Sequence, residues 1–330
     1  MGEEMKYLYI ALATLSVLLL LACKTSNASE AVEISDERVI FAFSRGMEPI
    51  QSVPAGTRLA IKTQDCFSNQ LRTSEDKLEA MDWNRVNPAT GPIFIEGTEP
   101  GDVLEVRIES IEVGTQGVMM VDKTFGVLKD RFDGMYFKIF PIKQGQVIFD
   151  EKLSIPVRPM IGVIGVAPGD GLFFNTGTPH SHGGNMDTNL IVAGTTLYLP
   201  VFEKGALLAL GDVHAVMGDG EICGTGVETP ATVTLVINIR KDIKLNNPVL
   251  DNGKEIMVIA SAETLDEASR IATSDMADIL ASHLPLDMQN INYLMSAIGN
   301  LQTSQVVDPL MTARFAMPKK HIENAYGFKF

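Results

Sequence analysis

The sequence is poor in cysteine, in tryptophan and in positive charge. Its 330 residues include three cysteines and one tryptophan, and 27 lysines and arginines stand against 41 acidic residues, a formal net charge of −14. Three cysteines are too few for a disulfide scaffold, so burial of apolar side chains has to stabilise the fold. Nucleic-acid binding is not expected, because a phosphate backbone would meet like charge over most of the surface.

The longest apolar run is too short for a comfortable membrane span. Tyr7 to Leu21 is a run of 15 residues, the length of a signal-peptide core. It leads into Leu20-Leu21-Ala22-Cys23, which resembles a bacterial lipobox, where cleavage precedes a lipid-carrying cysteine. We therefore expect residues 1–22 to be a lipoprotein signal peptide. Translation from Met5 would place the basic residue Lys6 ahead of the apolar run. The alternative to a cleaved signal peptide is an N-terminal anchor helix that is not removed.

Lipidation of Cys23 predicts a location in the cell envelope. The acyl chains would hold the chain at a membrane surface on the periplasmic side, with residues 23–34 as a polar tether. Lys24, which is not acidic, favours the outer membrane if the source is Gram-negative. Cys66 and Cys223 would then lie in an oxidising compartment, where they could pair or remain free thiols.

Residues 35–330 are expected to form a single, mainly β domain. Leu104–Glu109 alternates apolar and charged residues, as a half-buried strand does, and Thr232–Ile239 is rich in β-branched residues. Further short strands separated by turn residues are predicted at Arg58–Thr63, Tyr136–Ile142, Ile155–Val163, Thr195–Val201 and Ala206–Leu210. No long helical period occurs between residues 37 and 245, so we expect a β-sandwich or an irregular β-barrel.

The C-terminal part predicts a pair of helices. Thr264 and Glu267 have the capping-box spacing, and apolar residues then recur at helical intervals until Pro285. Asp287 can cap a second helix that ends near Gly299. The methionine-rich stripe of this pair is expected to pack on the sheet.

Histidines are scarce, and two of the five stand close together. His180 and His182 are two residues apart, so in an extended segment both rings point to the same side, as a metal requires of two ligands on one strand. Gly183 and Gly184 would let the backbone approach a bound group, and Asp187 is a candidate ligand. A solvated surface loop is the alternative interpretation.

A second window, residues 211–228, combines a histidine with several carboxylates in a glycine-rich segment. His214, Glu221 and Glu228 could serve as metal ligands or as acid–base groups. Calcium is possible because the carboxylates are hard oxygen ligands, but the EF-hand spacing is absent. A loop whose acidic residues only satisfy turns is the alternative.

Several motifs in a fixed order resemble the acetamidase/formamidase family. They spread over nearly the whole chain after the tether, and together they are far more specific than any one of them. The matching windows are Asn87–Pro92, Gly97–Leu104, His182–Asp187, Leu199–Val201 with Gly205–Leu207, and Gly211–Thr225 with Glu228. The resemblance implies a sandwich-like fold with appended helices, and hydrolysis of a short aliphatic amide to a carboxylate and ammonia.

The resemblance also implies a bound divalent metal and a set of site residues. The implied metal ligands are Asp65, His182 and His214. The implied ligands or acid–base groups are Asp187, Glu221 and Glu228, and the implied substrate contacts are His180, Gly183, Gly184, Asn185 and Cys223. Zinc is expected and calcium is possible, but the sequence does not fix the metal, since mixed histidine and carboxylate sites accept zinc, manganese, iron or calcium depending on geometry.

Amide hydrolysis requires a water made nucleophilic at neutral pH, an oxyanion site and a proton for the leaving nitrogen. We expect Glu228, or otherwise Glu221, to move the proton, and the N–H groups of Gly183 and Gly184 to support the oxyanion. Two alternatives stay open: an amidase with a cysteine nucleophile, and a lipid-anchored protein of this fold that binds an amide or a partner without turnover. A closed homo-oligomer is the expected assembly.

Overall fold

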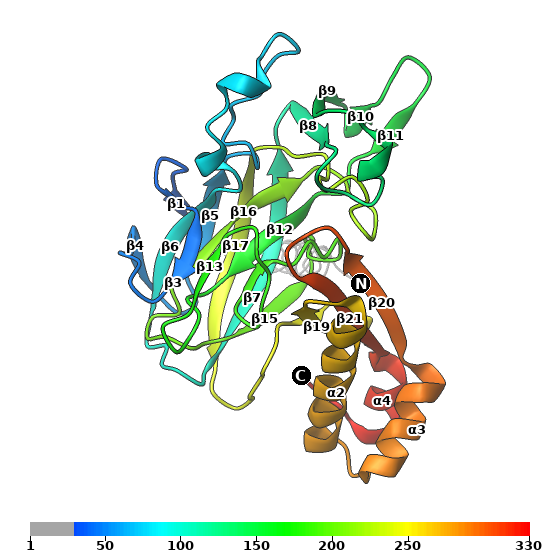
Figure 1. Ribbon diagram of the computed structural model, residues 1–330. Helices are drawn as coiled ribbons and strands as arrows, with labels where there is room; N and C mark the ends of the chain where they lie inside the picture. Colours follow the sequence, from blue (N-terminus) through cyan, green and yellow to red (C-terminus); the bar gives the residue numbers. More distant parts are fainter. Residues whose placement is uncertain (1–29) are drawn as a thin grey trace, which may run out of the picture. The chain divides into compact units, whose positions relative to one another are not determined.

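Two β-sheets packed face to face form the centre of the computed structural model, which describes residues 30–330 (Figure 1). The larger sheet has nine strands in the order β1-β5-β17-β7-β15-β18-β19-β21-β20. Its strands are β1 (Val32–Ile34), β5 (Arg58–Thr63), β7 (Val103–Val113), β15 (Thr196–Pro200), β17 (Ala231–Arg240), β18 (Val249–Asp251), β19 (Glu255–Ala262), β20 (Asn300–Gln305) and β21 (Met311–Pro318).

The second sheet has six strands and carries much of the functional site. Its order is β14-β12-β16-β6-β2, and β4 also pairs with β6. These strands are β2 (Val39–Ile40), β4 (Gln51–Pro54), β6 (Ala89–Glu96), β12 (Met160–Gly165), β14 (Gly183–Asn185) and β16 (Leu208–His214). Every residue of β12 and β16 is buried, because both strands lie inside the sheet and are covered on both faces.

Smaller elements surround this sandwich. A four-stranded sheet has the order β11-β10-β9-β8, and β13 pairs with β3. The bounds are β3 (Ala42–Ser44), β8 (Gln116–Val121), β9 (Tyr136–Lys143), β10 (Gln146–Ile148), β11 (Ser154–Pro156) and β13 (Phe173–Asn175). Three single-turn 3₁₀ helices are η1 (Leu78–Ala80), η2 (Trp83–Arg85) and η3 (Lys129–Arg131).

The main core lies between the two large sheets. Apolar side chains of β5, β7 and β17 meet those of β6, β12 and β16 in one cluster of buried residues. In β7 the buried positions recur along the strand as its alternating sequence predicts. The mainly β, sandwich-like class expected from the sequence is confirmed by this arrangement.

Two strands differ from the expected bounds. The segment expected to be one strand over 155–163 is split into β11 and β12, because Pro159 between them cannot donate a ladder hydrogen bond. β16 begins later than expected and continues to His214, because Ala206 and Leu207 adopt positive φ angles before it. Val32–Ile34, expected in the tether, instead pairs in parallel with β5.

Three helices pack on the C-terminal strands of the nine-stranded sheet. They are α2 (Leu265–His283), α3 (Met288–Ile298) and α4 (Lys319–Tyr326), and they lie together at one end of the sheet (Figure 1). Thr264 and Asp287 accept hydrogen bonds from the first turns of α2 and α3, as predicted. Met276 and Met295 are buried in a second cluster with residues of β19 and β21, which confirms the packing role of the methionine stripe.

The predictions for the N-terminal segment concern residues outside those described. The signal peptide 1–22, the lipidated Cys23 and most of the tether belong to this group. Within residues 30–330, no helix combines the length and the apolar character needed to cross a membrane. Cys66 and Cys223 are both free thiols.

Candidate functional site

One histidine stands among three carboxylates where β14, β16 and the segment before β17 meet. Nε2 of His214 lies 3.1 Å from a carboxylate oxygen of Glu228, 3.5 Å from one of Asp212 and 3.7 Å from one of Asp187. Asp212 and His214 belong to β16, and an isolated antiparallel bridge joins His214 to Glu228. The chain thus brings together groups that are far apart in sequence.

The polar atoms of this cluster are buried and lack hydrogen-bond partners. Asp187 and His214 have no exposed surface, and Glu228 is 1% exposed. Both carboxylate oxygens of Asp187, both ring nitrogens of His214 and one oxygen each of Glu221 and Glu228 are unsatisfied among the described residues. Buried polar atoms are normally paired, so this set of orphaned acceptors indicates a site for a bound ligand.

The cluster holds two groups of candidate metal ligands. Asp187, His214 and Glu221 offer three atoms within 4.8 Å of one another, and Cys66, Asp212 and Glu228 offer a second such set. Imidazole, carboxylate and thiol ligands are the set that zinc accepts, whereas calcium requires oxygens almost alone. The donor set and its orphaned atoms therefore fit a divalent metal.

Burial changes the acid–base properties of these groups. Burial, with the Asp212 charge beside it, raises the pKa of Asp187 to about 7. The pKa of Glu221 is raised by burial and by the neighbouring Asp187 and Asp308, and that of Glu228 by burial above all. Burial alone would lower the pKa of His214, but the charges of Glu228 and Asp212 raise it well above its ordinary value. The site can therefore hold protons near neutral pH.

The backbone around the carboxylates is strained. Asp187, Asp212 and Glu221 have φ angles of 38°, 52° and 48°, in the left-handed region that side chains disfavour. Such conformations persist where the surrounding structure fixes them, and they gather at functional sites. Gly162 of β12 provides the space, since a Cβ there would lie 2.5 Å from Asp187 Oδ1 and 2.6 Å from Asp212 Oδ2.

A cavity of about 560 Å³ opens onto the cluster. The carboxylates that line it come from three segments of the chain: Asp212, Glu221, Glu228 and Asp308. His214 and Asp187 lie behind these residues, without exposed surface. A small molecule in the cavity would thus reach the carboxylates directly.

Two predicted metal ligands, Asp65 and His182, belong to neither group of converging ligand atoms among the described residues. Asp65 is buried, but one of its oxygens accepts hydrogen bonds from the backbone N–H groups of Phe67 and Asn69, so it fixes its own loop. Burial raises the pKa of Asp65 to about 6. Asp65 belongs to neither group of converging ligands among the described residues, while the predicted ligand His214 belongs to one of them.

The rings of His180 and His182 pack against aromatic side chains. Both rings stack on Phe174, with centroids 4.7 and 5.1 Å away, and Phe43 contacts His182 edge-on at 5.0 Å. Burial, with the nearby His180, lowers the pKa of His182 to about 3, so its ring is neutral. The segment is not extended as expected, because His182 lies in a tight turn closed by hydrogen bonds between the backbones of His180 and Gly183. Both ring nitrogens of His182 are buried without a hydrogen-bond partner among the described residues.

The predicted substrate contacts are divided between two places. Asn185 lines the cavity, and its side-chain amide donates a hydrogen bond to Asp308 at 3.0 Å. Gly183 and Gly184 have positive φ angles, and the Gly183 N–H donates to the His180 carbonyl, so it is not free for an oxyanion. Cys223 is not among the described residues that line the cavity, and its thiol contacts Thr225.

Three residues of the site were not selected from the sequence: Cys66 as a ligand, Asp212 and Asp308. A signal for Asp212 exists, because residues two apart on a strand face the same side and Asp212 precedes His214 by two. The family resemblance extends to Val306–Pro309 but assigns no role to Asp308, which reaches the cavity from the loop between β20 and β21.

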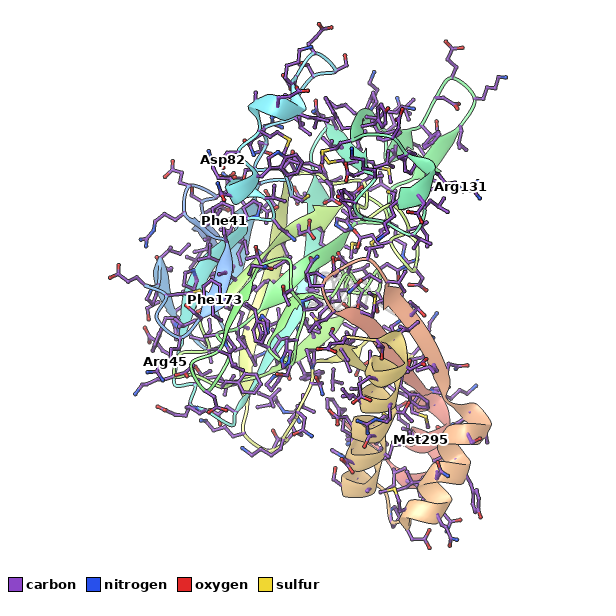
Figure 2. All side chains as sticks on the ribbon, viewed as in Figure 1. Phe41, Arg45, Asp82, Arg131, Phe173 and Met295 are labelled. Atoms are coloured by element: carbon purple, nitrogen blue, oxygen red, sulfur yellow. The ribbon has the colours of Figure 1, made fainter. Side chains whose placement is uncertain are left out.

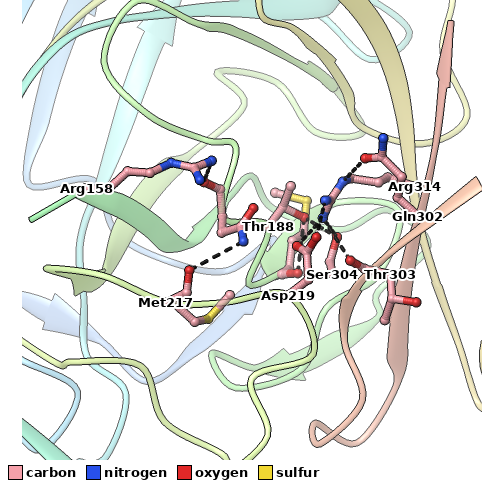
Figure 3. Close-up of polar contacts among 10 residues, drawn as sticks. Arg158, Thr188, Met217, Asp219, Gln302, Thr303, Ser304 and Arg314 are labelled. Carbon is pink, nitrogen blue, oxygen red and sulfur yellow. Dashed lines mark hydrogen bonds and ion pairs between the residues drawn. The ribbon is translucent and has the colours of Figure 1, made fainter. Parts of the chain in front are cut away.

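A buried arginine joins the β20–β21 hairpin to two segments of the site (Figure 3). Arg314 is 3% exposed and makes two parallel hydrogen bonds, of 2.9 and 2.8 Å, to the carboxylate of Asp219, two residues before Glu221. It also donates to Ser304, whose hydroxyl accepts from Thr188, the neighbour of Asp187. Arg314 therefore positions the segments that carry Asp187 and Glu221.

Comparison with known proteins gives a consistent result. The family model described as the acetamidase/formamidase family matches residues 28–177 and 171–264. A putative formamidase of Schizosaccharomyces pombe is 24% identical over 269 residues, covering 60% of this chain and 64% of that protein. The formamidase of Methylophilus methylotrophus is 26% identical over 265 residues, covering 61% and 64%. The match thus spans less than two thirds of the length of these curated relatives.

Solved structures match over a larger share of the chain. A predicted acetamidase/formamidase from Thermoanaerobacter tengcongensis is 53% identical, with a TM-score of 0.88 over 90% of this chain and 98% of that one. An acetamidase from Bacillus halodurans is 46% identical, with a TM-score of 0.87 over 90% and 100%.

Proposed function

This chain belongs to the acetamidase/formamidase family, and we propose that it is a metal-dependent hydrolase that cleaves the C–N bond of a small carboxamide. The products would be a carboxylate and ammonia. The observation that carries the proposal is the buried cluster of His214, Asp187 and Glu228, whose metal-ligating atoms lack hydrogen-bond partners and lie behind a cavity. The names of the related formamidases and acetamidases support the amide substrate.

The metal would be held by the converging ligands described above. Asp187, His214 and Glu221 form one set, and Cys66, Asp212 and Glu228 the other. A bound divalent cation of the zinc type supplies Lewis acidity, which polarises a carbonyl and lowers the pKa of a water from ~15.7 toward about 7. These sets are proposed in place of the sequence-based set of Asp65, His182 and His214, with His214 common to both proposals.

The carboxyl groups of the cavity move the protons of the reaction. Glu228 and Glu221 line the cavity and have a raised pKa, and whichever of the two does not hold the metal can accept a proton from the attacking water. The same proton then passes to the amide nitrogen, which leaves as ammonia because a neutral amine is a far better leaving group than an amide anion. Asn185, held by Asp308, is placed to orient the substrate amide.

A thiol mechanism has less support. Cys66 is the cysteine that lines the cavity, and burial together with the charges of Glu228 and Asp212 raises its pKa. The thiolate is the nucleophilic form, so this environment disfavours attack by Cys66. A zinc-type metal would reverse this effect only by taking the thiolate as a ligand.

The proposal is tested by ammonia release together with metal analysis. The wild-type protein should release ammonia from primary amides, and a chelator should abolish this release. His214→Ala should lose both the metal and the activity, while His321→Ala, which changes an exposed histidine of α4, should lose neither. Full activity in a metal-free sample would overturn the metal mechanism, and absence of ammonia from every amide with the metal bound would overturn the hydrolase function.

We also propose that the mature chain is lipid-anchored through Cys23 on the periplasmic side of the cell envelope. The support is the order of the apolar run, Leu20-Leu21-Ala22-Cys23 and the polar segment after it. Detergent partitioning of the expressed wild type, compared with Cys23→Ser, tests this. A wild-type protein that stays in the aqueous phase would contradict it.

A further inference from the structure

We infer that the natural substrate is a neutral primary amide with an apolar acyl group about the size of a phenyl ring, and not formamide or acetamide. The inference rests on the proposed amidase function and narrows its substrate class. The observations behind it are the volume of the cavity, the aromatic character of its outer wall and the sign of the charges that line it.

The cavity is much larger than the smallest amides. Its volume of about 560 Å³ lies within the range of about 300–1,000 Å³ typical of sites for drug-sized ligands. Formamide and acetamide have only a few non-hydrogen atoms and would leave most of this space to water. An acyl group of greater size would fill it and displace that water from apolar surface.

Beside polar residues such as Asn84, Asn87 and Asn175, the wall beyond the carboxylates has an apolar, largely aromatic part. This part consists of Phe41, Phe67, Trp83, Met120, Phe125 and Pro309. Phe67 and Met120 are fixed in a buried cluster that also contains Cys66, and Phe125 packs against that cluster. The wall is therefore preformed and continuous with the site, because Cys66 is a candidate ligand at its inner end.

Trp83 forms the outer part of this wall. It is 45% exposed and opens the short helix η2, whose N-cap Asp82 accepts a hydrogen bond from the N–H of Asn84. In Figure 2, Asp82 and Phe41 lie far from the helical end of the molecule, where Met295 is labelled. A large exposed aromatic side chain at a cavity mouth gives apolar contact area at little conformational cost.

The charges that line the cavity are all negative. Asp212, Glu221, Glu228 and Asp308 contribute carboxylates, and no lysine or arginine lines the cavity among residues 30–330. Apart from the proposed metal, an acyl group with its own carboxylate would find no cationic partner here, and it would meet the carboxylates of the cavity. This favours a neutral apolar acyl group over a dicarboxylic half-amide.

Kinetics of matched amides test the inference. For the wild type supplied with zinc, kcat/KM for phenylacetamide should exceed that for acetamide at least tenfold, and hexanamide should exceed adipamate by a similar factor. Phe125→Ala should lower the ratio of kcat/KM for phenylacetamide to kcat/KM for acetamide about tenfold. Tyr293→Ala, which removes an aromatic ring 65% exposed on α3 and outside the cavity, should leave the ratio unchanged.

The outcomes separate this inference from the proposed function. Acetamide hydrolysed with a kcat/KM equal to or above that for phenylacetamide would overturn the substrate class but leave the amidase function standing. If no amide is hydrolysed, binding still decides, because Trp83 is the single tryptophan of the chain and its fluorescence reports on the cavity. Phenylacetamide should change Trp83 emission at concentrations where acetamide does not, and no change with phenylacetamide would overturn the inference.

Discussion

Single residues decide whether the carboxylates of the site can converge. Asp187 and Asp212 approach each other across Gly162, in a space that no other residue type would leave open. The left-handed backbone of Asp187 and Asp212 is a strained conformation that costs free energy. Contacts with neighbouring segments have to offset this cost. The chemistry of the site is thus coupled to positions that carry no functional group.

Gly162→Ala should therefore disrupt the site. The new Cβ would lie 2.5 Å from Asp187 Oδ1 and 2.6 Å from Asp212 Oδ2, so at least one carboxylate has to move. We expect metal affinity and kcat to fall about 10–100-fold, as measured by metal content after dialysis and by ammonia release. Gly218→Ala is the matched control, because a Cβ at Gly218 meets no atom within 4 Å. Unchanged metal content in Gly162→Ala would contradict the geometry.

His182 should make the fold sensitive to acid. Burial lowers its pKa to about 3, whereas the unfolded chain has the ordinary value near 6.5. Between these two values the unfolded state binds a proton that the folded state does not, so stability falls as the pH falls from about 6.5 toward 3. The contribution of one such group is about 1.4 kcal/mol per pH unit.

The measurement is the free energy of unfolding in urea at several pH values below 6.5. Glutamine in His182→Gln cannot take up the proton. The free energy of unfolding of this variant should therefore fall less steeply with decreasing pH than that of the wild type, and the two slopes should differ by the amount that one bound proton causes. His321→Gln, at an exposed position, should follow the wild type. Identical slopes for His182→Gln and the wild type would show that the ring is not buried as a neutral group.

Among the elements, the β20–β21 hairpin supports the site although it lies in the C-terminal part of the nine-stranded sheet. The backbone of Gly220 exchanges hydrogen bonds with Ser304 and Val306, and Arg314 of β21 holds Asp219. The loop of the hairpin also supplies Asp308 to the cavity. Helix packing on β19 and β21 therefore stabilises strands that in turn position Glu221.

Arg314→Gln should lower both stability and activity. The guanidinium is 3% exposed and bonds to Asp219, Gln302, Thr303 and Ser304, so its loss leaves several groups without partners (Figure 3). We expect a loss of about 3 kcal/mol in the free energy of unfolding and a fall in kcat.

Urea unfolding and ammonia release measure the two effects, with Arg270→Gln as the matched control. Arg270 pairs with Glu267 on the exposed face of α2, and such a pair contributes less than about 1 kcal/mol. If Arg314→Gln behaves like Arg270→Gln in both assays, the hairpin does not position the site.

At the scale of the whole molecule, bound metal should stabilise the fold. The ligands of the set that contains His214 come from the segment after β14, from β16 and from the turn before Cys223, so one ion would join three segments that are separate in sequence. A ligand at 100 times its Kd stabilises a folded protein by about 2.7 kcal/mol. Removing the metal with a chelator should lower the free energy of unfolding by about this amount.

Thermal or urea unfolding with and without chelator tests this expectation. His214→Ala serves as the reference, because a protein that cannot hold the metal should show no response to the chelator. A chelator effect of equal size in His214→Ala and in the wild type would contradict the assignment of the site.

Part of this description follows from local sequence patterns. The alternation in Leu104–Glu109, the β-branched run Thr232–Ile239 and the caps Thr264 and Asp287 correctly indicate strands and helices. The motif order indicates the family, and residues 211–228 contain four groups of the cluster, Asp212, His214, Glu221 and Glu228, all but Asp212 being candidates from the sequence. These signals are readable because they depend on spacing along a few turns or strand residues.

The tertiary structure alone decided which of the candidates meet. Asp65 and His182 have suitable chemistry, but one fixes its own loop and the other packs against Phe174. The family resemblance spans the windows of Cys66 and Asp308 without making either a ligand, and long-range strand pairing brings both to the same cavity. The period of a strand fixes the side to which a residue points, whereas sheet order and loop paths, which depend on contacts between distant segments, fix what it points at.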